Sequence, residues 1–334
     1  MTAMRCVLVD PYATRNADRL AASLTTPWDI QTVARQDSES MLKDTLSTAE
    51  AAISQVWNQN LGRNAAKLRL LQLPNAGTDG VDWGAVSEGC TVCNEFEHGT
   101  AVAEFVLLAM LEFRIGLRGL DQNFRGGDWG DSHVSFGRLH GEMAGATVGL
   151  IGYGRIAQAI ARRAAAFDVT VAAVSRRKPD DPILNWSGSM MALDSMLPRC
   201  DFVVIACPLT AETCGLIDER QLALMQDSAV LINIARAGIA DEAALFSALS
   251  DRKIAGAALD VWWRYPDDSD ASPRPSRFPF WKLPNVLMTP HVAAWTDGML
   301  ARRWKKIAAN LDRFATGAPL ENVVRRPKSG EPPV

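Results

Sequence analysis

The sequence lacks long apolar runs and carries no large excess of charge of either sign. No stretch approaches the roughly 18–20 consecutive apolar residues that a membrane-spanning helix needs. The first residues, MTAMRCVLVD, hold too short an apolar run for a secretory signal. A net charge of −3 favours neither nucleic acid nor an anionic membrane surface as a partner. We therefore expect a cytoplasmic protein that binds neither.

Cysteine pairs and histidines are also scarce. Only Cys90 and Cys93, among six cysteines, form a C-x-x-C, and no second pair or histidine stands at metal-ligand spacing. This pattern favours reduced, structural cysteines and no metal site. Only four histidines occur in 334 residues, so few candidates exist for acid–base catalysis.

Alternating apolar strands and helical segments fill most of the chain. Its length favours two domains. Strands are expected at 6–10, 28–33, 51–56, 68–73 and 90–94, and again at 146–152, 169–175, 201–208, 229–235, 254–261 and 286–291. Helices between most of them predict an α/β fold with parallel sheets covered on both faces. Residues 99–124 are expected to form one long apolar helix, buried between domains or against another subunit.

A glycine-rich turn, GLIGYGRIA, follows the strand expected at 146–152. Gly152 allows the tight turn, and Gly154 lets the backbone approach a pyrophosphate. Ala157 is small enough for close packing of helix on strand, and Arg155 and Ile156 open the helix whose N-terminus stabilises phosphate charge. The motif predicts a dinucleotide site.

The strand after this turn ends without the acid that would bind the ribose hydroxyls of NAD. Ser175, Arg176 and Arg177 stand there instead, followed by Lys178. Hydroxyl and guanidinium donors suit a ribose 2′-phosphate. NADP is therefore favoured over NAD, and a solvated basic turn is the alternative.

Three further segments come directly after expected strands. Arg236 follows one strand, the stretch LDVWWRYP (259–266) continues from the next, and His291 follows the one after. Ligands of open α/β sheets bind outside the carboxyl ends of the strands. We expect these groups to converge beside the cofactor.

With these motifs the chain resembles the D-isomer-specific 2-hydroxyacid dehydrogenase family, in particular its glyoxylate/hydroxypyruvate reductase-like members, over nearly its whole length. The motifs are PNAGTDGVD (74–82), VAE (102–104), GLIGYGRIA (149–157), PLTAET (208–213), NIARAG (233–238), LDV (259–261) and TPH (289–291). The resemblance implies two Rossmann-like domains, one flavodoxin-like and substrate-binding (1–98 plus 293–334) and one dinucleotide-binding (99–292), with a cleft between them. It also implies a homodimer through the helix around 103–124.

The implied activity interconverts a 2-oxo acid and a D-2-hydroxy acid by hydride transfer with NADP or NAD. By resemblance, Arg236 binds the substrate carboxylate and polarises the oxo group. His291 is the implied general acid/base. The implied backbone donors to the carboxylate are Asn75, Ala76, Gly77 and Thr78. The implied cofactor-lining residues are Pro208, Thr213, Ala235, Asp260 and His291.

One position departs from the family pattern. Tyr265 stands before Pro266 where relatives carry a glutamate, or a glutamine in formate-dehydrogenase-like members. A phenol with a reference pKa of about 10 can fix the tautomer of His291 but supplies no charge. We therefore expect a lower pKa for His291 than in glutamate-bearing relatives. An acid elsewhere could also serve the histidine; the candidates are Glu97, Asp267, Asp268 and Asp297.

Two other functions remain open at this stage. One is a dehydrogenase of phosphite or formate, although nothing matches the formate-type glutamine. The other is a nucleotide-sensing scaffold or corepressor on the same fold, because fold alone does not decide function. The presence of both Arg236 and His291 favours catalysis.

Overall fold

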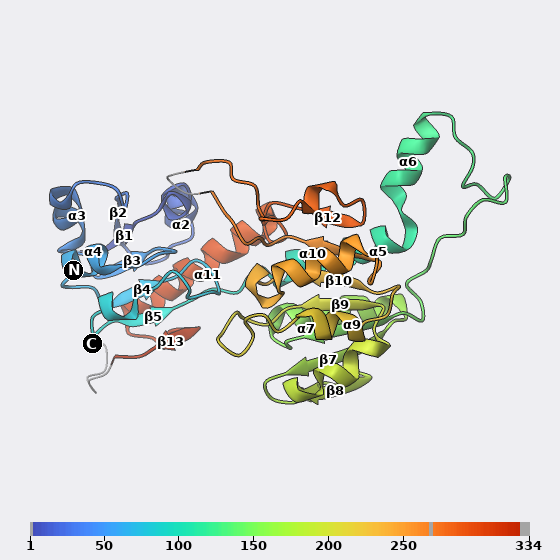
Figure 1. Ribbon diagram of the computed structural model, residues 1–334. Helices are drawn as coiled ribbons and strands as arrows, with labels where there is room; N and C mark the ends of the chain where they lie inside the picture. The colour runs from blue at the N-terminus through green and yellow to red at the C-terminus, as the bar shows by residue number, and fades with distance from the viewer. Residues whose placement is uncertain (1–2, 267–269, 328–334) are drawn as a thin grey trace. The chain divides into compact units, whose positions relative to one another are not determined.

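A computed structural model of the chain describes residues 3–266 and 270–327 (Figure 1). The chain divides into two compact units, Met1–Glu97 with Thr296–Val334, and His98–Trp295. The domain boundaries expected from the sequence lie within a few residues of these divisions. The roles assigned to the two domains stay predictions.

The first unit is built on a six-stranded sheet in the order β13-β5-β4-β3-β1-β2. Its strands are β1 (Met4–Leu8), β2 (Trp28–Thr32), β3 (Ala51–Ile53), β4 (Leu70–Gln72), β5 (Thr91–Cys93) and β13 (Val323–Arg325). Neighbouring strands run parallel except β13, which pairs antiparallel with β5. The expectation of a covered parallel sheet is confirmed for the five strands nearest the start of the chain.

Helices cover both faces of this sheet. They are α1 (Pro11–Thr14), α2 (Ala17–Ala21), α3 (Glu39–Leu46), α4 (Gln59–Asn64) and α11 (Asp297–Thr316). On one face α2 and α11 bury residues such as Leu20, Ile307 and Leu311 against the strands. On the other face α3 and α4 contribute Leu42 and Leu61 to a second cluster.

The second unit is built on a seven-stranded parallel sheet in the order β12-β11-β10-β9-β6-β7-β8. Its strands are β6 (Thr147–Ile151), β7 (Thr170–Ser175), β8 (Trp186–Ser189), β9 (Phe202–Ile205), β10 (Val230–Asn233), β11 (Gly256–Leu259) and β12 (Val286–Met288). The strand order reverses at β6 and β9, which is where doubly wound sheets bind nucleotides at their carboxyl edge.

Both faces of the second sheet are also covered, as the buried runs of parallel strands require. The helices are α5 (Gly99–Ile115), α6 (Leu117–Arg125), α7 (Arg155–Ala164), α8 (Leu193–Met196), α9 (Glu219–Leu224) and α10 (Glu242–Ser250). Val106 and Ile160, from α5 and α7, lie in one cluster, and residues of α8, α9 and α10 lie in the cluster on the opposite face. The predicted α/β architecture is confirmed.

The prediction of one continuous helix over 99–124 is wrong, while its burial against another subunit stays a prediction. Gly116 adopts a left-handed conformation with φ +73° and ends α5, and α6 begins directly after it. Within this unit α6 and the loop after it extend away from the sheet (Figure 1). No residue of α6, all of which are described, is buried, and Leu117 and Phe124 are 63% and 55% exposed. The glycine breaks the helix because it alone enters the left-handed region without steric cost.

Two strands were not expected from the sequence. The strand β8 reads WSGS and has little apolar content, so a pattern of hydrophobic runs does not reveal it. The last residues, RRPKSGEPPV (325–334), have the composition of a frayed tail, but the strand β13 includes Arg325. Its guanidinium donates to the carbonyls of Trp83 and Val86. Residues 328–334 of that tail lie outside the described residues. In the described ranges, every helix is too short or too polar to traverse a bilayer.

Candidate active site

The turn between β6 and α7 accepts only glycine at its first position. Gly152 has φ +93°, and a Cβ atom there would lie 2.7 Å from the backbone nitrogen of Cys207. Cys207 follows β9, the neighbour of β6 in the sheet. The close approach of the two chain segments therefore requires the glycine that the dinucleotide motif supplies.

The N-terminus of α7 fits a pyrophosphate. Gly154 is exposed and its missing Cβ faces open space, so a ligand can reach the backbone there. Within the described residues no side chain caps this helix end. The amide groups of its first turn and the helix dipole both favour an anion. Ala157, one turn on, is fully buried, as close packing of helix on strand demands.

The end of β7 carries the exposed cations predicted to bind a 2′-phosphate. Arg176 and Arg177 are exposed. The Ser175 hydroxyl donates to the carbonyl oxygen of Arg177 at 2.5 Å, so it shapes the turn that holds the two guanidinium groups. These side chains present cationic donors next to the glycine-turn strand, since β7 neighbours β6.

A carboxylate that the sequence does not predict lies near the glycine turn. The hydroxyl of Tyr153, the residue between the two motif glycines, donates to Oδ2 of Asp181 at 2.9 Å. Asp181 lies six positions after Ser175 in the sequence, and no pattern of strands or motifs links it to Tyr153. Tyr153 and Asp181 meet because the two loops that carry them lie side by side.

The residues predicted to line the cofactor after β9 and β10 make hydrogen bonds within their own turns. The Thr213 hydroxyl donates to the carbonyl of Pro208 at 2.7 Å and accepts from the amide of Thr210 at 2.8 Å. The Ala235 amide donates to Oδ1 of Asn233 at 3.1 Å. These contacts fix the loops at the carboxyl edge, and contact with a cofactor stays a prediction for these residues.

Arg236, Tyr265 and His291 come from the carboxyl ends of three neighbouring strands. The strands β10, β11 and β12 are adjacent and parallel, so the segments that follow them leave the sheet at one edge. Arg236 is half-buried, and its Nη1 donates to the carbonyl of Ala235 at 2.8 Å. Burial raises the pKa of Tyr265 and lowers that of His291, and the nearby positive charge of Arg236 favours a lower pKa for both. The structure therefore brings these three residues together.

Tyr265 contacts the catalytic histidine candidate directly. Its hydroxyl oxygen lies 3.0 Å from Nδ1 of His291 and accepts a hydrogen bond from the amide of Trp262 at 3.2 Å. With that amide already donating to the oxygen, the phenolic proton can be donated to Nδ1. This arrangement leaves the proton of the neutral imidazole on Nε2.

Asp260 anchors the turn that carries His291. It is 1% exposed, and its carboxylate accepts from the hydroxyl of Thr289 at 2.6 Å and the amides of Val292 and Ala293 at 2.8 and 2.9 Å. These bonds hold His291 at φ +57°, a left-handed conformation that histidine adopts more readily than most residues. The sequence predicts a cofactor contact for Asp260; the structure shows that its two oxygens serve this turn.

Burial sets the protonation of the pair. It lowers the pKa of His291 below its ordinary value, and of the two nearby charges Asp260 raises that pKa while Arg236 lowers it. His291 as a whole residue is exposed, so the protein atoms that desolvate its ring cover the residue only in part. Burial also raises the pKa of Tyr265, although the Trp262 amide opposes this. Both side chains are therefore neutral at pH 7.

The acids considered as other partners of His291 have their own contacts or lie outside the description. Asp267 and Asp268 fall outside the described residues. In the first unit Glu97 lies 3.6 Å from Nε of Arg302, and Oδ1 of Asp297 accepts from the amide of Gly298. The contact that the structure shows at Nδ1 of His291 is the phenol of Tyr265.

The loop predicted to bind a carboxylate follows β4 and is held by side-chain amides. Asn75 Nδ2 donates to the carbonyl of Gly77 at 2.5 Å, and Asn94 Nδ2 donates to the carbonyl of Ala76 at 2.8 Å. The amide of Val81 closes the loop on the carbonyl of Thr78 at 3.0 Å. Because these bonds occupy carbonyl oxygens, they fix the backbone without consuming the amide donors that a ligand would need.

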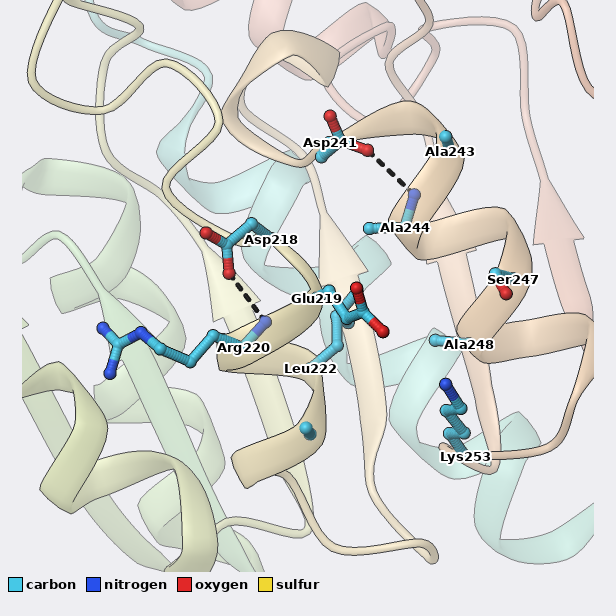
Figure 2. Close-up of a pocket in the computed structure, with 11 residues that line it drawn as sticks. Asp218, Glu219, Arg220, Leu222, Asp241, Ala243, Ala244, Ser247, Ala248 and Lys253 are labelled. Atoms are coloured by element: carbon cyan, nitrogen blue, oxygen red, sulfur yellow. Dashed lines mark hydrogen bonds between the residues drawn. The ribbon is translucent and has the colours of Figure 1, made fainter.

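A hollow of about 870 Å³ lies away from these residues, between α9 and α10 (Figure 2). Three of the polar residues that line it already make structural contacts. Asp218 and Asp241 accept from backbone amides at the starts of the two helices, and Arg220 pairs with Asp194 at 2.6 Å. None of the described residues that line it belongs to the predicted site. We assign it no ligand.

Comparison with known proteins places this geometry in a family. The family model described as "D-isomer specific 2-hydroxyacid dehydrogenase, NAD binding domain" matches residues 107–293. A glyoxylate reductase of Pyrococcus horikoshii is 34% identical over 281 residues, which span 82% of this chain and 81% of the relative. The chain therefore belongs to the D-isomer specific 2-hydroxyacid dehydrogenase family.

Solved structures agree with this membership. A 2-hydroxyacid dehydrogenase of Ketogulonicigenium vulgare matches with a TM-score of 0.81 and 26% identity, over 98% of this chain and 100% of that one. An NADPH-dependent glyoxylate/hydroxypyruvate reductase of Sinorhizobium meliloti, in complex with NADP and sulfate, matches with a TM-score of 0.77 and 26% identity. That match covers 96% of this chain and 98% of the other. The expected two-domain α/β fold is confirmed.

Proposed function

We propose that this protein reduces a 2-oxo acid to the D-2-hydroxy acid with NADPH, and catalyses the reverse oxidation. The observation that carries the proposal is the grouping of Arg236, Tyr265 and His291 at three neighbouring strand ends, on the sheet whose glycine turn fits a dinucleotide. The glyoxylate reductase and the glyoxylate/hydroxypyruvate reductase among the relatives support a small 2-oxo acid as substrate.

In this mechanism His291 moves the proton and Arg236 holds the acid. When bound, the nicotinamide supplies the hydride that reaches C2 of the substrate. Nε2 of His291 gives a proton to the oxo oxygen during reduction and takes it back during oxidation. The Arg236 guanidinium pairs with the carboxylate and stabilises charge developing on the oxo oxygen. The amides of the Asn75–Thr78 loop are proposed as further donors to the carboxylate.

Tyr265 is proposed to position His291 without charging it. The phenol fixes the ring through Nδ1 and directs the Nε2 proton outward. A carboxylate in its place would stabilise the imidazolium, whereas the neutral phenol does not. Reduction needs the imidazolium, so its rate is expected to fall as the pH rises through a pKa that lies below the ordinary histidine value of about 6.5.

Replacing Tyr265 by glutamate is therefore expected to shift the pH profile of reduction. The added carboxylate favours the charged ring, so the decline of kcat/KM with rising pH should move upward by about one pH unit or more. Steady-state reduction of glyoxylate across pH 5–9 measures the shift. Tyr265→Phe is the matched control, since it removes the hydroxyl without adding charge and is expected to lower kcat with no upward shift. A Tyr265→Glu profile that coincides with the wild-type profile would contradict the proposed coupling.

The proposed preference for NADP rests on Ser175, Arg176 and Arg177. The two exposed guanidinium groups can bind a 2′-phosphate through charge-assisted hydrogen bonds, and the Ser175 hydroxyl shapes their turn. Because Asp181 brings a carboxylate near the glycine turn, NAD is the cofactor that the test has to exclude. The solved structure of the Sinorhizobium meliloti reductase contains NADP, which supports NADP as the proposed cofactor here.

One assay separates the candidate functions. Purified protein is mixed with NADPH or NADH and a panel of 2-oxo acids, and the nicotinamide absorbance is followed; the reverse reaction is run with phosphite and with formate. We expect turnover of 2-oxo acids with higher kcat/KM for NADPH. Turnover of phosphite or formate alone would support the second candidate function. Tight cofactor binding without any turnover would support a nucleotide-sensing scaffold.

We propose that the protein is a homodimer through α5, α6 and the loop that follows. Apolar side chains are exposed on this part of the second unit, among them Leu108, Leu117, Phe124, Trp129 and Phe136. Phe124 and Trp129 pack edge to face with centroids 4.9 Å apart, so these two side chains form one continuous apolar surface. Apolar surface of this extent is typical of an interface. A monomeric mass in light scattering would contradict the dimer.

A further inference from the structure

The segment that carries the basic residues is tied to the rest of the protein at both ends. It leaves β7 at Ser175, whose hydroxyl bonds the Arg177 carbonyl, and reaches Asp181 a few residues later. There Oδ2 of Asp181 accepts the hydrogen bond from Tyr153, in the glycine turn after β6. The backbone that carries the cations is therefore held at both ends, one of them at the turn that fits the pyrophosphate.

The anchor at Asp181 is itself well ordered. Its Oδ1 accepts from the amide of Ile183 at 3.1 Å, and its carbonyl accepts from the amide of Leu184 at 3.0 Å. Ile183 and Leu184 pack, together with Tyr153, against the hydrophobic cluster under α7. Burial, followed by the Asp181 contact, raises the pKa of Tyr153 above its ordinary value. The phenol therefore keeps its proton and remains a donor to Asp181 at any pH the enzyme meets.

The hydrogen bond from Tyr153 also sets the direction in which the Asp181 carboxylate points. Arg176, Arg177 and Lys178 are exposed on the same short segment as the exposed Asp180 and the half-buried Asp181. The Asp181 carboxylate accepts hydrogen bonds from the hydroxyl of Tyr153 and from the amide of Ile183. The positive charge that acts on Tyr153 is that of Arg162. Without the Tyr153 hydroxyl this carboxylate could turn to the exposed cations and compete with a phosphate for them.

We propose that Tyr153 and Asp181 form a positioning pair that sets the preference for a ribose 2′-phosphate. The pair holds Arg176 and Arg177 at the correct distance from the pyrophosphate turn and keeps the Asp181 carboxylate turned away from them. This inference rests on the proposed use of NADP. Holding a binding group in place before the ligand arrives raises affinity because less ordering is needed on binding.

The test compares the binding of NADPH and NADH to the full chain, followed by nicotinamide fluorescence, with steady-state kinetics beside it. Tyr153→Phe and Asp181→Ala are expected to weaken NADPH binding about fivefold to twentyfold, less than the loss of a hydrogen bond made to the phosphate itself, because the pair acts only through the two guanidinium groups. NADH binding should change less than about twofold, as the pair acts on the phosphate-binding cations. The kcat at saturating NADPH should stay unchanged, because neither residue touches the reacting atoms.

Two conservative variants separate geometry from charge. Asp181→Asn keeps an oxygen that accepts from Tyr153 and is expected to restore most of the NADPH affinity that Asp181→Ala loses. Asp180→Asn removes one negative charge from the same segment without touching Tyr153 and is the matched control. If Asp180→Asn and Asp181→Ala change NADPH affinity equally, charge alone matters and the positioning pair is overturned.

The double variant Arg176→Ala/Arg177→Ala separates failure of the pair from failure of the NADP proposal. Wild-type protein that binds NADH as tightly as NADPH, or binds neither, overturns the NADP preference itself. If wild type prefers NADPH and the double variant loses this preference while Tyr153→Phe and Asp181→Ala retain it, only the pair is refuted. Equal weakening of both cofactors by Tyr153→Phe also refutes the pair. Loss of NADH binding in Asp181→Ala would instead assign the carboxylate to the ribose of NAD.

Discussion

Replacing His291 by asparagine lowers kcat for 2-oxo acid reduction about 10²–10⁴-fold, the usual contribution of a positioned acid–base group. Asparagine suits this test because it tolerates the left-handed conformation that His291 holds at φ +57°. The turn should therefore keep its shape while the proton donor is lost. The KM for the 2-oxo acid should change little, because Arg236 is proposed to hold the carboxylate. Initial rates at saturating NADPH measure both constants.

The control for this variant is His140→Asn in the same unit. His140 is exposed, and its Nδ1 lies 3.1 Å from the carbonyl of Gly141. Its replacement should leave kcat within about twofold of wild type, because the loop that carries His140 is proposed to contact a second subunit and not the substrate. A His291→Asn enzyme that retains more than a tenth of wild-type kcat would exclude His291 as the proton donor.

Replacing Asp260 by asparagine is expected to lower the free energy of unfolding by about 2–4 kcal/mol. The carboxylate is almost fully buried and accepts three hydrogen bonds from the turn after β12. An amide keeps one acceptor oxygen but directs an NH₂ group at a backbone N–H, so at least one donor loses its partner. Because the same turn carries His291, kcat should fall with stability.

Asp241→Asn provides the matched comparison. Asp241 also accepts a backbone hydrogen bond, from Ala244 at the start of α10, but it is exposed. Asparagine caps helices as well as aspartate does, so the change in unfolding free energy should stay below about 0.5 kcal/mol. Chemical denaturation of both variants gives the comparison. Equal stability of Asp260→Asn and wild type would show that the three bonds do not hold the turn.

The pattern of apolar residues predicted the sheets, but it did not predict the helix break at a single residue or the strand with few apolar residues. Apart from β8 and β13, the strands of both units are apolar runs between turns, and both sheets form where the sequence predicts those runs. The break between α5 and α6 was missed because the apolar content continues across Gly116, while one left-handed residue ends the helix. The strand β8 was missed because its sequence has few apolar residues to detect.

The candidate site shows a similar contrast between residues at strand ends and contacts between loops. Residues attached to strand ends, such as Arg236 and His291, were predictable because parallel strands deliver their carboxyl ends to one edge. The contact of Asp181 with Tyr153 and the three bonds of Asp260 depend on how separate loops fold back. No spacing in the sequence encodes such contacts.

The central claim is stereospecific hydride transfer to C2 of a 2-oxo acid, with the proton supplied by His291. Reduction of hydroxypyruvate with NADPH that carries two deuterium atoms at nicotinamide C4, followed by chiral analysis of the product, tests it most directly. The account predicts D-glycerate that carries the deuterium on C2, formed by the wild type and about 10²–10⁴-fold more slowly by His291→Asn. Glycerate of the L configuration, or no glycerate at all although NADPH binds, would contradict it.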